Sequence, residues 1–268
     1  MVDKSEKFRW LVRVGYFARA VLYTLLGIIA LTSAQKISQG AEGVFQAIQD
    51  YPAGTVLLWI LAIGLLGYAL FRFASTFFDI ENHGSDKKGI AQRLGHAGSG
   101  IGHLVLAWSA YKFATSQGGG GGGSGGGAQQ AAAGVLSFEF GSVVLGLVGL
   151  LFLAAAFFQG KKGITGEFMR RISPRAPDVT RWLGGAGFLA RAVVFAVIGW
   201  SLMQSGWFSS SAQVVTLGGA IASLGDKGIL FTLVAVGLLM FGLFSFVLAR
   251  YRIIPDMDAS RGVPSFRR

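Results

Sequence analysis

The chain has 268 residues, of which 52% are hydrophobic and only 14% charged, and it carries a formal net charge of +11. Soluble domains carry about 25% charged residues, so this composition predicts a polytopic membrane protein. The absence of cysteine excludes disulfides, thiolate metal sites and cysteine nucleophiles. The 41 glycines suit close approach of helices in lipid, where packing drives helix association.

Six runs of the chain are candidates for the roughly 20 apolar residues that a bilayer-spanning helix needs. They lie at residues 10–32, 56–78, 94–115, 142–158, 183–205 and 229–249. The first run follows basic residues, as a signal peptide does, but it is longer than the apolar region of about 7–15 residues in a secretory signal. We therefore expect it to be a retained first helix. The third run is the weakest, because it contains several glycines and two histidines.

The basic residues are distributed unevenly between the two ends of these runs. All but five of the 24 Lys and Arg residues lie in the N-terminus, the second and fourth connections, and the C-terminus. The positive-inside rule then places both termini in the cytoplasm. If the third run did not cross, the basic connection at 161–181 would lie outside, so the pattern favours six crossings. The positive-inside topology and the attraction of basic residues to anionic lipid headgroups account for the net positive charge. We therefore expect no nucleic-acid partner.

Internal repeats organise the chain. The phrase Gly15-Tyr-Phe-Ala-Arg-Ala-Val-Leu-Tyr23 recurs as Gly187-Phe-Leu-Ala-Arg-Ala-Val-Val-Phe195, and the run 64–71 recurs at 237–244. A more divergent copy at 93–103 lies over 13–23, with Ser99 at the arginine position. The pattern predicts an all-α integral membrane protein of six transmembrane helices, arranged as three parallel two-helix repeats in a pseudo-threefold bundle.

The repeats predict domain boundaries at 1–90, 91–178 and 179–268. Short amphipathic segments at 41–53 and 212–224 are expected to form external helices that lie in the membrane interface. The middle repeat instead carries a Gly-rich stretch at 118–127, which we expect to be a flexible, disordered linker.

These phrases, together with the closing Ala249-Arg-Tyr-Arg252, resemble the bacterial membrane-protein family named domain of unknown function 1206. The resemblance covers nearly the whole chain. It implies three tandem two-helix units in the bacterial cytoplasmic (inner) membrane, and no activity. The middle unit departs from the pattern at Ser99, His96 and His103, which puts a site shared by all three units in question there.

Arg19 and Arg191 lie well inside apolar segments, where an arginine costs roughly 2.5–3.5 kcal/mol on insertion scales. Each has aromatic residues three positions before and four after it, on the same helical face and within reach for cation–π contacts: Tyr16, Tyr23, Phe188 and Phe195. No acidic residue falls inside a predicted span. The remaining partners for the guanidinium groups are backbone carbonyls, water, a lipid phosphate or the acidic group of another ligand.

Three hypotheses follow for these arginines. They could snorkel towards the cytoplasmic interface and cap helix carbonyls, bind an anionic lipid headgroup or acidic cofactor group, or bind another membrane protein or complex. The expected anion- or lipid-binding residues are Arg19, Arg191, Tyr16, Tyr23, Phe188, Phe195 and Ser99. The expected function is that of a non-enzymatic membrane structural or accessory protein whose partners are anionic membrane lipids. We expect no cofactor of its own.

Two other classes of function are weighed against this one. A small transporter or channel would need a continuous polar path, and the predicted spans hold no acid for a proton relay. An enzyme would need a pocket where His96, His103 and both arginines converge. His96 and His103 are also weak candidates for metal ligands, but they align with aromatic positions of the other repeats, which favours packing. His83 lies in a polar loop and is expected to be solvated.

Overall fold

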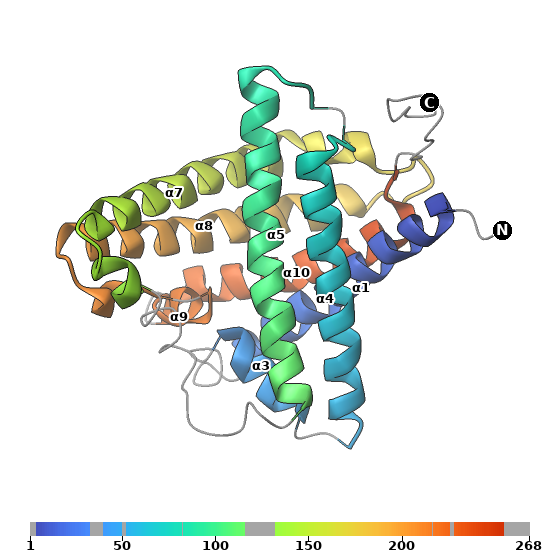
Figure 1. Cartoon of the computed structure of the whole chain (residues 1–268). Coiled ribbons are helices and arrows are strands. Elements are labelled where there is room, and N and C mark those ends of the chain that lie inside the picture. The colour runs from blue at the N-terminus through green and yellow to red at the C-terminus, as the bar shows by residue number, and fades with distance from the viewer. Residues whose placement is uncertain are drawn as a thin grey trace.

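The computed structural model describes residues 4–32, 40–49, 52–81, 83–115, 132–215, 217–225 and 228–254. These residues form a helical protein (Figure 1). Six helices are long: α1 (Lys4–Thr32), α4 (Gly54–Phe77), α5 (Lys87–Ala114), α7 (Gly141–Thr165), α8 (Thr180–Trp207) and α10 (Ile229–Tyr251). The shorter elements are α3 (Gly40–Gln49), η1 (Glu167–Arg171), η2 (Ser211–Gln213) and α9 (Leu217–Ala222). The predicted linker at 118–127 lies outside the described residues.

The long helices coincide with the six predicted apolar runs, and five of them are long and apolar enough to cross a membrane. Those spans are Val12–Thr32, Gly54–Phe77, Gly141–Thr165, Thr180–Trp207 and Ile229–Tyr251. The protein is therefore a multi-pass membrane protein. Helix α5 has 28 residues, which is long enough to cross. It is not among these five apolar spans, and Lys87, Lys88, Arg93 and several glycines occupy its first half.

The helices pack in an order that follows the repeats. Helix α4 packs on α5, α7 on α8 and α10 on α1, so the second long helix of each repeat contacts the first helix of another. Within the repeats, α1 packs on α4 and α8 on α10, but α5 and α7 form no comparable interface in the described residues. In Figure 1, α4 and α5 run side by side towards the bottom, whereas α7 and α8 extend to the left. The six long helices thus pack as an open series in the order α5, α4, α1, α10, α8 and α7.

Within the first and third repeats, small residues allow the two long helices to approach each other closely. A Cβ on Gly15 would lie 2.8 Å from the Cβ of Tyr68, and a Cβ on Gly187 would lie 2.7 Å from that of Phe241. The two glycines occupy equivalent repeat positions, so both repeats use the same helix–helix contact. A second pair of equivalent contacts lies one turn away: Gly64 on Ala18 and Gly237 on Ala190.

One end of the bundle holds α3 and α9; the opposite end, which we call the basic end, holds the start of α1 and the last turn of α10. Arg13 on α1 donates to the carbonyl oxygens of Ala249 and Arg250 at 2.9 and 2.6 Å, and these bonds join α1 to α10. Donors from one helix thereby satisfy the open carbonyls at the C-terminus of the other.

The helix predicted at 41–53 is present as α3, but the expectation that the apolar faces of 41–53 and 212–224 lie against the membrane interface is wrong. The apolar face of α3 is fully packed, with Val44, Phe45 and Ile48 buried against neighbouring helices. The second segment is divided into η2 and α9, and Ala220 and Ile221 are fully buried. The bundle itself covers these apolar faces, so they do not need lipid to cover them.

Candidate functional site

Arg19 lies in the interior of the helix bundle with 5% of its surface exposed. Its Nη1 donates to the hydroxyl of Tyr68 at 2.6 Å, and its Nε donates to the hydroxyl of Ser245 at 3.2 Å. The rings of Tyr16, Tyr68 and Phe241 lie 4.7–5.0 Å from the guanidinium carbon. The snorkelling hypothesis is therefore wrong for Arg19, because hydroxyl groups and aromatic faces hold its charge inside the protein.

Arg191 is half-buried on α8 and faces the same aromatic ring as Arg19. Its guanidinium carbon lies 4.6 Å from the centroid of Phe241, 5.0 Å from that of Phe195 and 5.6 Å from that of Tyr23. Its Nε is buried and has no hydrogen-bond partner among the described residues. The two guanidinium groups thus share the ring of Phe241, and neither contacts a carboxylate in the described part of the chain.

A third arginine completes this interior group. Arg72 follows Tyr68 by four residues on α4, and its Nε and Nη2 donate to the Tyr68 hydroxyl at 2.9 and 2.6 Å. Together with Arg19, three N–H groups point at one phenol oxygen, which has only two lone pairs. The donors outnumber the acceptors here. Arg72 lies inside the predicted run 56–78 and belongs to the basic residues that the charge pattern assigns to the cytoplasmic side, but its i, i+4 spacing from Tyr68 also predicts a contact between the two side chains.

Glu81 is the carboxylate that neutralises the basic end of the bundle. It is 4% exposed, although it lies in the loop after α4. Arg252 donates to its Oε1 at 2.5 Å, Arg171 donates to its Oε2, and Arg72 lies 3.7 Å away. Burial alone would raise the pKa of Glu81, but Arg252, the hydrogen bonds from His83 and His96, and Arg72 hold that pKa well below its ordinary value. Glu81 is therefore ionised.

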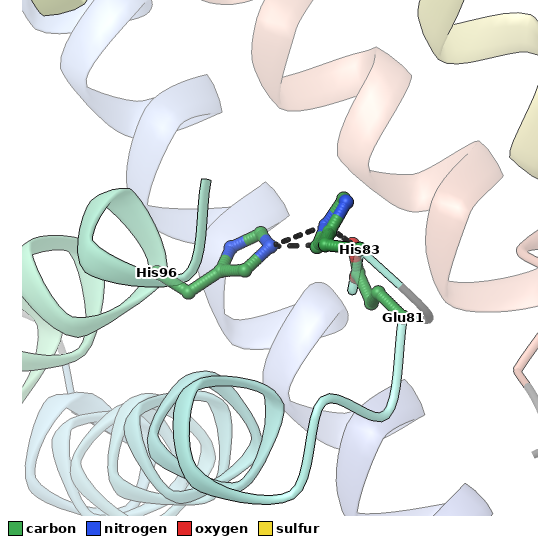
Figure 2. Close-up of side chains that lie close together, drawn as sticks. All are labelled: Glu81, His83 and His96. Carbon is green, nitrogen blue, oxygen red and sulfur yellow. Dashed lines mark hydrogen bonds and ion pairs between the residues drawn. The ribbon is translucent and has the colours of Figure 1, made fainter. Parts of the chain in front are cut away.

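Two histidines complete this group, which we call the Glu81 cluster. The Nε2 atoms of His83 and His96 lie 3.0 Å apart, and each lies 3.4 Å from Oε2 of Glu81 (Figure 2). The expectation that His83 is solvated is wrong, because its side chain is only 12% exposed. Asp79 accepts hydrogen bonds from the backbone N–H groups of His83 and Gly84, and these bonds fold the loop back onto the bundle.

The three ligand-type atoms of Glu81, His83 and His96 are spaced as in a metal site. Four tetrahedral zinc ligands at about 2.0–2.1 Å from the ion lie about 3.3 Å from one another. However, Arg72 Nη1 lies 2.8 Å from Nδ1 of His96, and arginine can only donate. Nδ1 is then the acceptor, and neutral His96 carries its proton on Nε2, which leaves no lone pair for a metal. The surrounding arginines also repel a cation, so these residues do not fit a metal.

The remaining predicted residues pack around the interior arginines rather than forming a second site. His103 is 7% exposed, its Nδ1 donates to the carbonyl of Ser99 at 2.7 Å, and its Nε2 has no partner among the described residues. Its ring lies 4.5 Å from that of Tyr68, just as Tyr23 lies 4.9 Å from Phe241. His103 thus occupies an aromatic packing position. Phe188 packs on Phe241 and Phe244.

Comparison with known proteins finds one family that matches the chain three times in succession. Three segments of the chain, residues 14–79, 94–166 and 186–252, match the family described as Domain of Unknown Function (DUF1206), and the chain belongs to that family. It is 29% identical over 262 residues to the uncharacterized protein YxxB of Bacillus subtilis (strain 168), across 93% of this chain and 94% of the relative. No solved structure matches the chain. The exact repeat boundaries stay a prediction.

Replacing Tyr68 with Phe should destabilise the protein, because Arg19 and Arg72 lose a shared acceptor. Hydrogen bonds to charged groups contribute about 1.5–3 kcal/mol each, so we expect a loss of at least that size in the free energy of unfolding. Denaturant unfolding in detergent micelles measures it. Tyr23→Phe is the matched control, because no hydrogen bond of the Tyr23 hydroxyl is found among the described residues, and its stability should change little. Equal stability of both variants would contradict the assignment of Tyr68 as the acceptor.

Replacing Glu81 with Gln should cost about 3–5 kcal/mol at neutral pH, since it leaves buried arginines without their counter-ion. The pKa of Glu81 is depressed, so its stabilisation is complete above its ordinary value of 4.5 and is lost as the pH falls through its lower folded value. The difference in stability between wild type and variant should therefore shrink in strong acid. Glu139→Gln, at an exposed position, should change nothing. A difference independent of pH would contradict an ionised Glu81.

Proposed function

We propose that this protein is a non-enzymatic membrane structural or accessory protein that binds the anionic headgroup of a lipid at its interior arginines. The observation that carries the proposal is an excess of buried positive charge. Arg19, Arg72 and Arg191 lie close enough for their charges to act on one another or on shared neighbours. Among the side chains whose burial the structure describes, Glu81 is the only buried carboxylate, and Arg171 and Arg252 already bind it.

The chemistry of the unpartnered groups favours a phosphate. Arg191 Nε and the hydroxyl of Tyr16 are buried donors without a partner in the described residues, and the Tyr68 hydroxyl faces more donors than it can accept. A phosphate group brings several strong acceptor oxygens and negative charge, and arginine binds it in a bidentate manner. Anionic lipids carry such a group at the depth of the basic end of the bundle.

The distribution of polar groups favours binding over transport. A transporter or channel needs polar groups across the whole membrane depth. Here the interior arginines and the Glu81 cluster lie in the half of the bundle near the basic end. The opposite end is filled by apolar side chains of α3 and α9, including Phe45 and Ile221. A small transporter or channel is therefore the second candidate.

We further propose that α5 is a sixth crossing, so that three parallel two-helix repeats surround a pseudo-threefold axis in the bacterial cytoplasmic membrane, with both termini in the cytoplasm. Helix α5 packs along α4, which is itself apolar enough to span. If α5 did not cross, the basic segment 161–181 would face outwards, against the positive-inside rule.

Single cysteines test the crossing of α5, because the chain has no cysteine of its own. Ala133 and Asp178 are both exposed and lie on either side of α7. In spheroplasts, a membrane-impermeant maleimide should label Ala133→Cys at once and Asp178→Cys only after permeabilisation. The reverse pattern would show that α5 does not cross. The unsubstituted chain, which should not react, is the control.

Lipid retention tests the proposed function. Protein extracted from vesicles of phosphatidylglycerol and phosphatidylcholine should retain phosphatidylglycerol in native mass spectrometry. Arg191→Gln should reduce retention about tenfold or more, because a charge-assisted hydrogen bond contributes about 1.5–3 kcal/mol. Arg170→Gln removes an equal charge from an exposed position on the basic side and should retain the lipid.

A second arm with inorganic phosphate separates a lipid headgroup from the free ion. Excess phosphate should not displace the lipid if its acyl chains contribute to binding. Displacement by phosphate alone would indicate a site for the free ion. Equal lipid retention by wild type and Arg191→Gln would reject the proposal.

A further inference from the structure

Two of the three histidines of the chain face each other at the basic end of the bundle, and the proposed lipid site does not involve them. His83 lies in the loop between α4 and α5, and His96 lies in the first half of α5. Their Nε2 atoms are 3.0 Å apart, and both side chains are largely buried (Figure 2). The contact between the two rings thus joins the loop to α5.

The neighbours of His96 determine where the hydrogens of this pair lie. Arg72 Nη1 lies 2.8 Å from Nδ1 of His96 and can only donate, so neutral His96 carries its hydrogen on Nε2. An N–H on Nε2 of His83 would point at Oε2 of Glu81 at 3.4 Å, but two N–H groups would then oppose each other at 3.0 Å. In the neutral pair, Nε2 of His83 is therefore the acceptor and its hydrogen lies on Nδ1.

The charge of Glu81 is already shared among arginines. Arg171 and Arg252 bind its two carboxylate oxygens, and Arg72 lies 3.7 Å away. Three cations thus surround one anion before either histidine is charged. The charged groups of the elements packed around the pair are Arg72 from α4, Asp79 and Glu81 from the loop, Arg93 from α5, Lys162 from α7, Arg171 from η1 and Arg252 from the end of α10.

A proton taken up by the pair has two possible positions, and each breaks a contact. At Nδ1 of His96 it would face the guanidinium of Arg72, which the hydroxyl of Tyr68 also holds in place. At Nε2 of His83 it would face the N–H of His96. His83 is the residue that can respond, because it belongs to a loop whose following residues, 84–86, are exposed to water.

The backbone of the loop is held independently of the histidine pair. Asp79 has a φ of 45°, and its carboxylate accepts hydrogen bonds from the backbone N–H groups of His83 and Gly84, both at 2.8 Å. Burial alone would raise the pKa of Asp79, but these two bonds and the charge of Arg93 lower it below its ordinary value. Asp79 is therefore ionised wherever histidine titrates, and the side chain of His83 can turn while the loop stays folded.

We infer that His83 is an acid-released latch between the α4–α5 loop and α5. Histidine takes up a proton between roughly pH 8 and 5. His83 then becomes charged, leaves Nε2 of His96 and turns out to water, while His96 stays neutral against Arg72 and donates to Glu81 alone. Since one proton is taken up, the ratio of released to latched protein rises up to about tenfold per pH unit. The latch does not depend on a lipid at the interior arginines, and with the proposed topology it responds to cytoplasmic pH.

Histidine-selective isotope labelling tests the inference on the unsubstituted protein, because the chain has three histidines. At about pH 8, in micelles, the ring nitrogen chemical shifts should show His96 protonated on Nε2 and His83 on Nδ1. In acid, His83 should become doubly protonated and be relaxed by a soluble gadolinium chelate, while His96 stays neutral. The inference is overturned if His96 is protonated first, if charged His83 stays out of reach of the chelate, or if His83 stays neutral down to about pH 5.

Two substitutions of His83 should fix the two states. Gln offers His96 an amide oxygen and takes up no proton in this range, so His83→Gln should stay latched. Lys is charged throughout the range, so His83→Lys should be released at every pH. The Nε2–H signal of His96 should move with pH in the wild type, stay at its neutral position in His83→Gln and lie at its acid position in His83→Lys.

Ser85→Lys is the matched control, because it adds the same charge at an exposed position of the loop and leaves the pair intact. It should keep the wild-type response of His96. A response in His83→Gln equal to that of the wild type would overturn the latch. A constant signal in Ser85→Lys would overturn it as well, because charge near the loop would then suffice.

Discussion

The burial of arginine in a membrane protein, without an acid of its own, is the constraint that organises this structure. A guanidinium in the hydrocarbon region is costly unless its donors and its charge are satisfied. At Arg19 the protein supplies two hydroxyl acceptors and three aromatic faces. Those groups come from α1, α4 and α10, so satisfying one charge fixes how three helices meet. Tyr68 is central to this arrangement because its hydroxyl also accepts hydrogen bonds from Arg72. Arg72 in turn lies 3.7 Å from Glu81, so it connects Tyr68 to the Glu81 cluster.

At the basic end of the bundle, the Glu81 cluster likewise satisfies buried arginines and fixes how helices meet. Its arginines come from α4, from η1 and from the end of α10, so one carboxylate joins all three repeats. Ile172 and Arg252 also form an isolated antiparallel bridge, which brings the segment after η1 alongside the end of α10. A buried carboxylate surrounded by arginines gives specificity to the docking of the repeats, because any other register leaves charges unpaired. The other helix–helix interfaces consist of small residues and aromatic rings. Such contacts tolerate a shift of one helix along another more readily than the ion pairs of Glu81 do.

Sequence reasoning anticipated the apolar helices, the repeats and the two central arginines, since these depend on local periodicity and composition. It missed the roles of Arg72, Glu81 and His83, because their partners lie far away in the chain. Arg171 and Arg252 are 90 and 171 residues from Glu81, and no spacing rule brings them together. It predicted the helix α3 but not the burial of its apolar face, because an amphipathic face is compatible both with a membrane interface and with a protein core. The choice between them depends on tertiary packing rather than on the segment itself.

The middle repeat differs from the other two in two respects. It has no arginine at the interior position, and its two long helices share no comparable interface in the described residues. Three exact copies would place three arginines on the α1, α5 and α8 positions, with one buried carboxylate in the described residues to balance them. On α5 this position is Ser99, so the helix carries no arginine there. The repeat that lacks this arginine is also the one whose helices do not pack on each other. An arginine at position 99 would add one more positive charge to be balanced, whereas serine is neutral. The missing arginine and the missing helix contact thus occur in the same repeat.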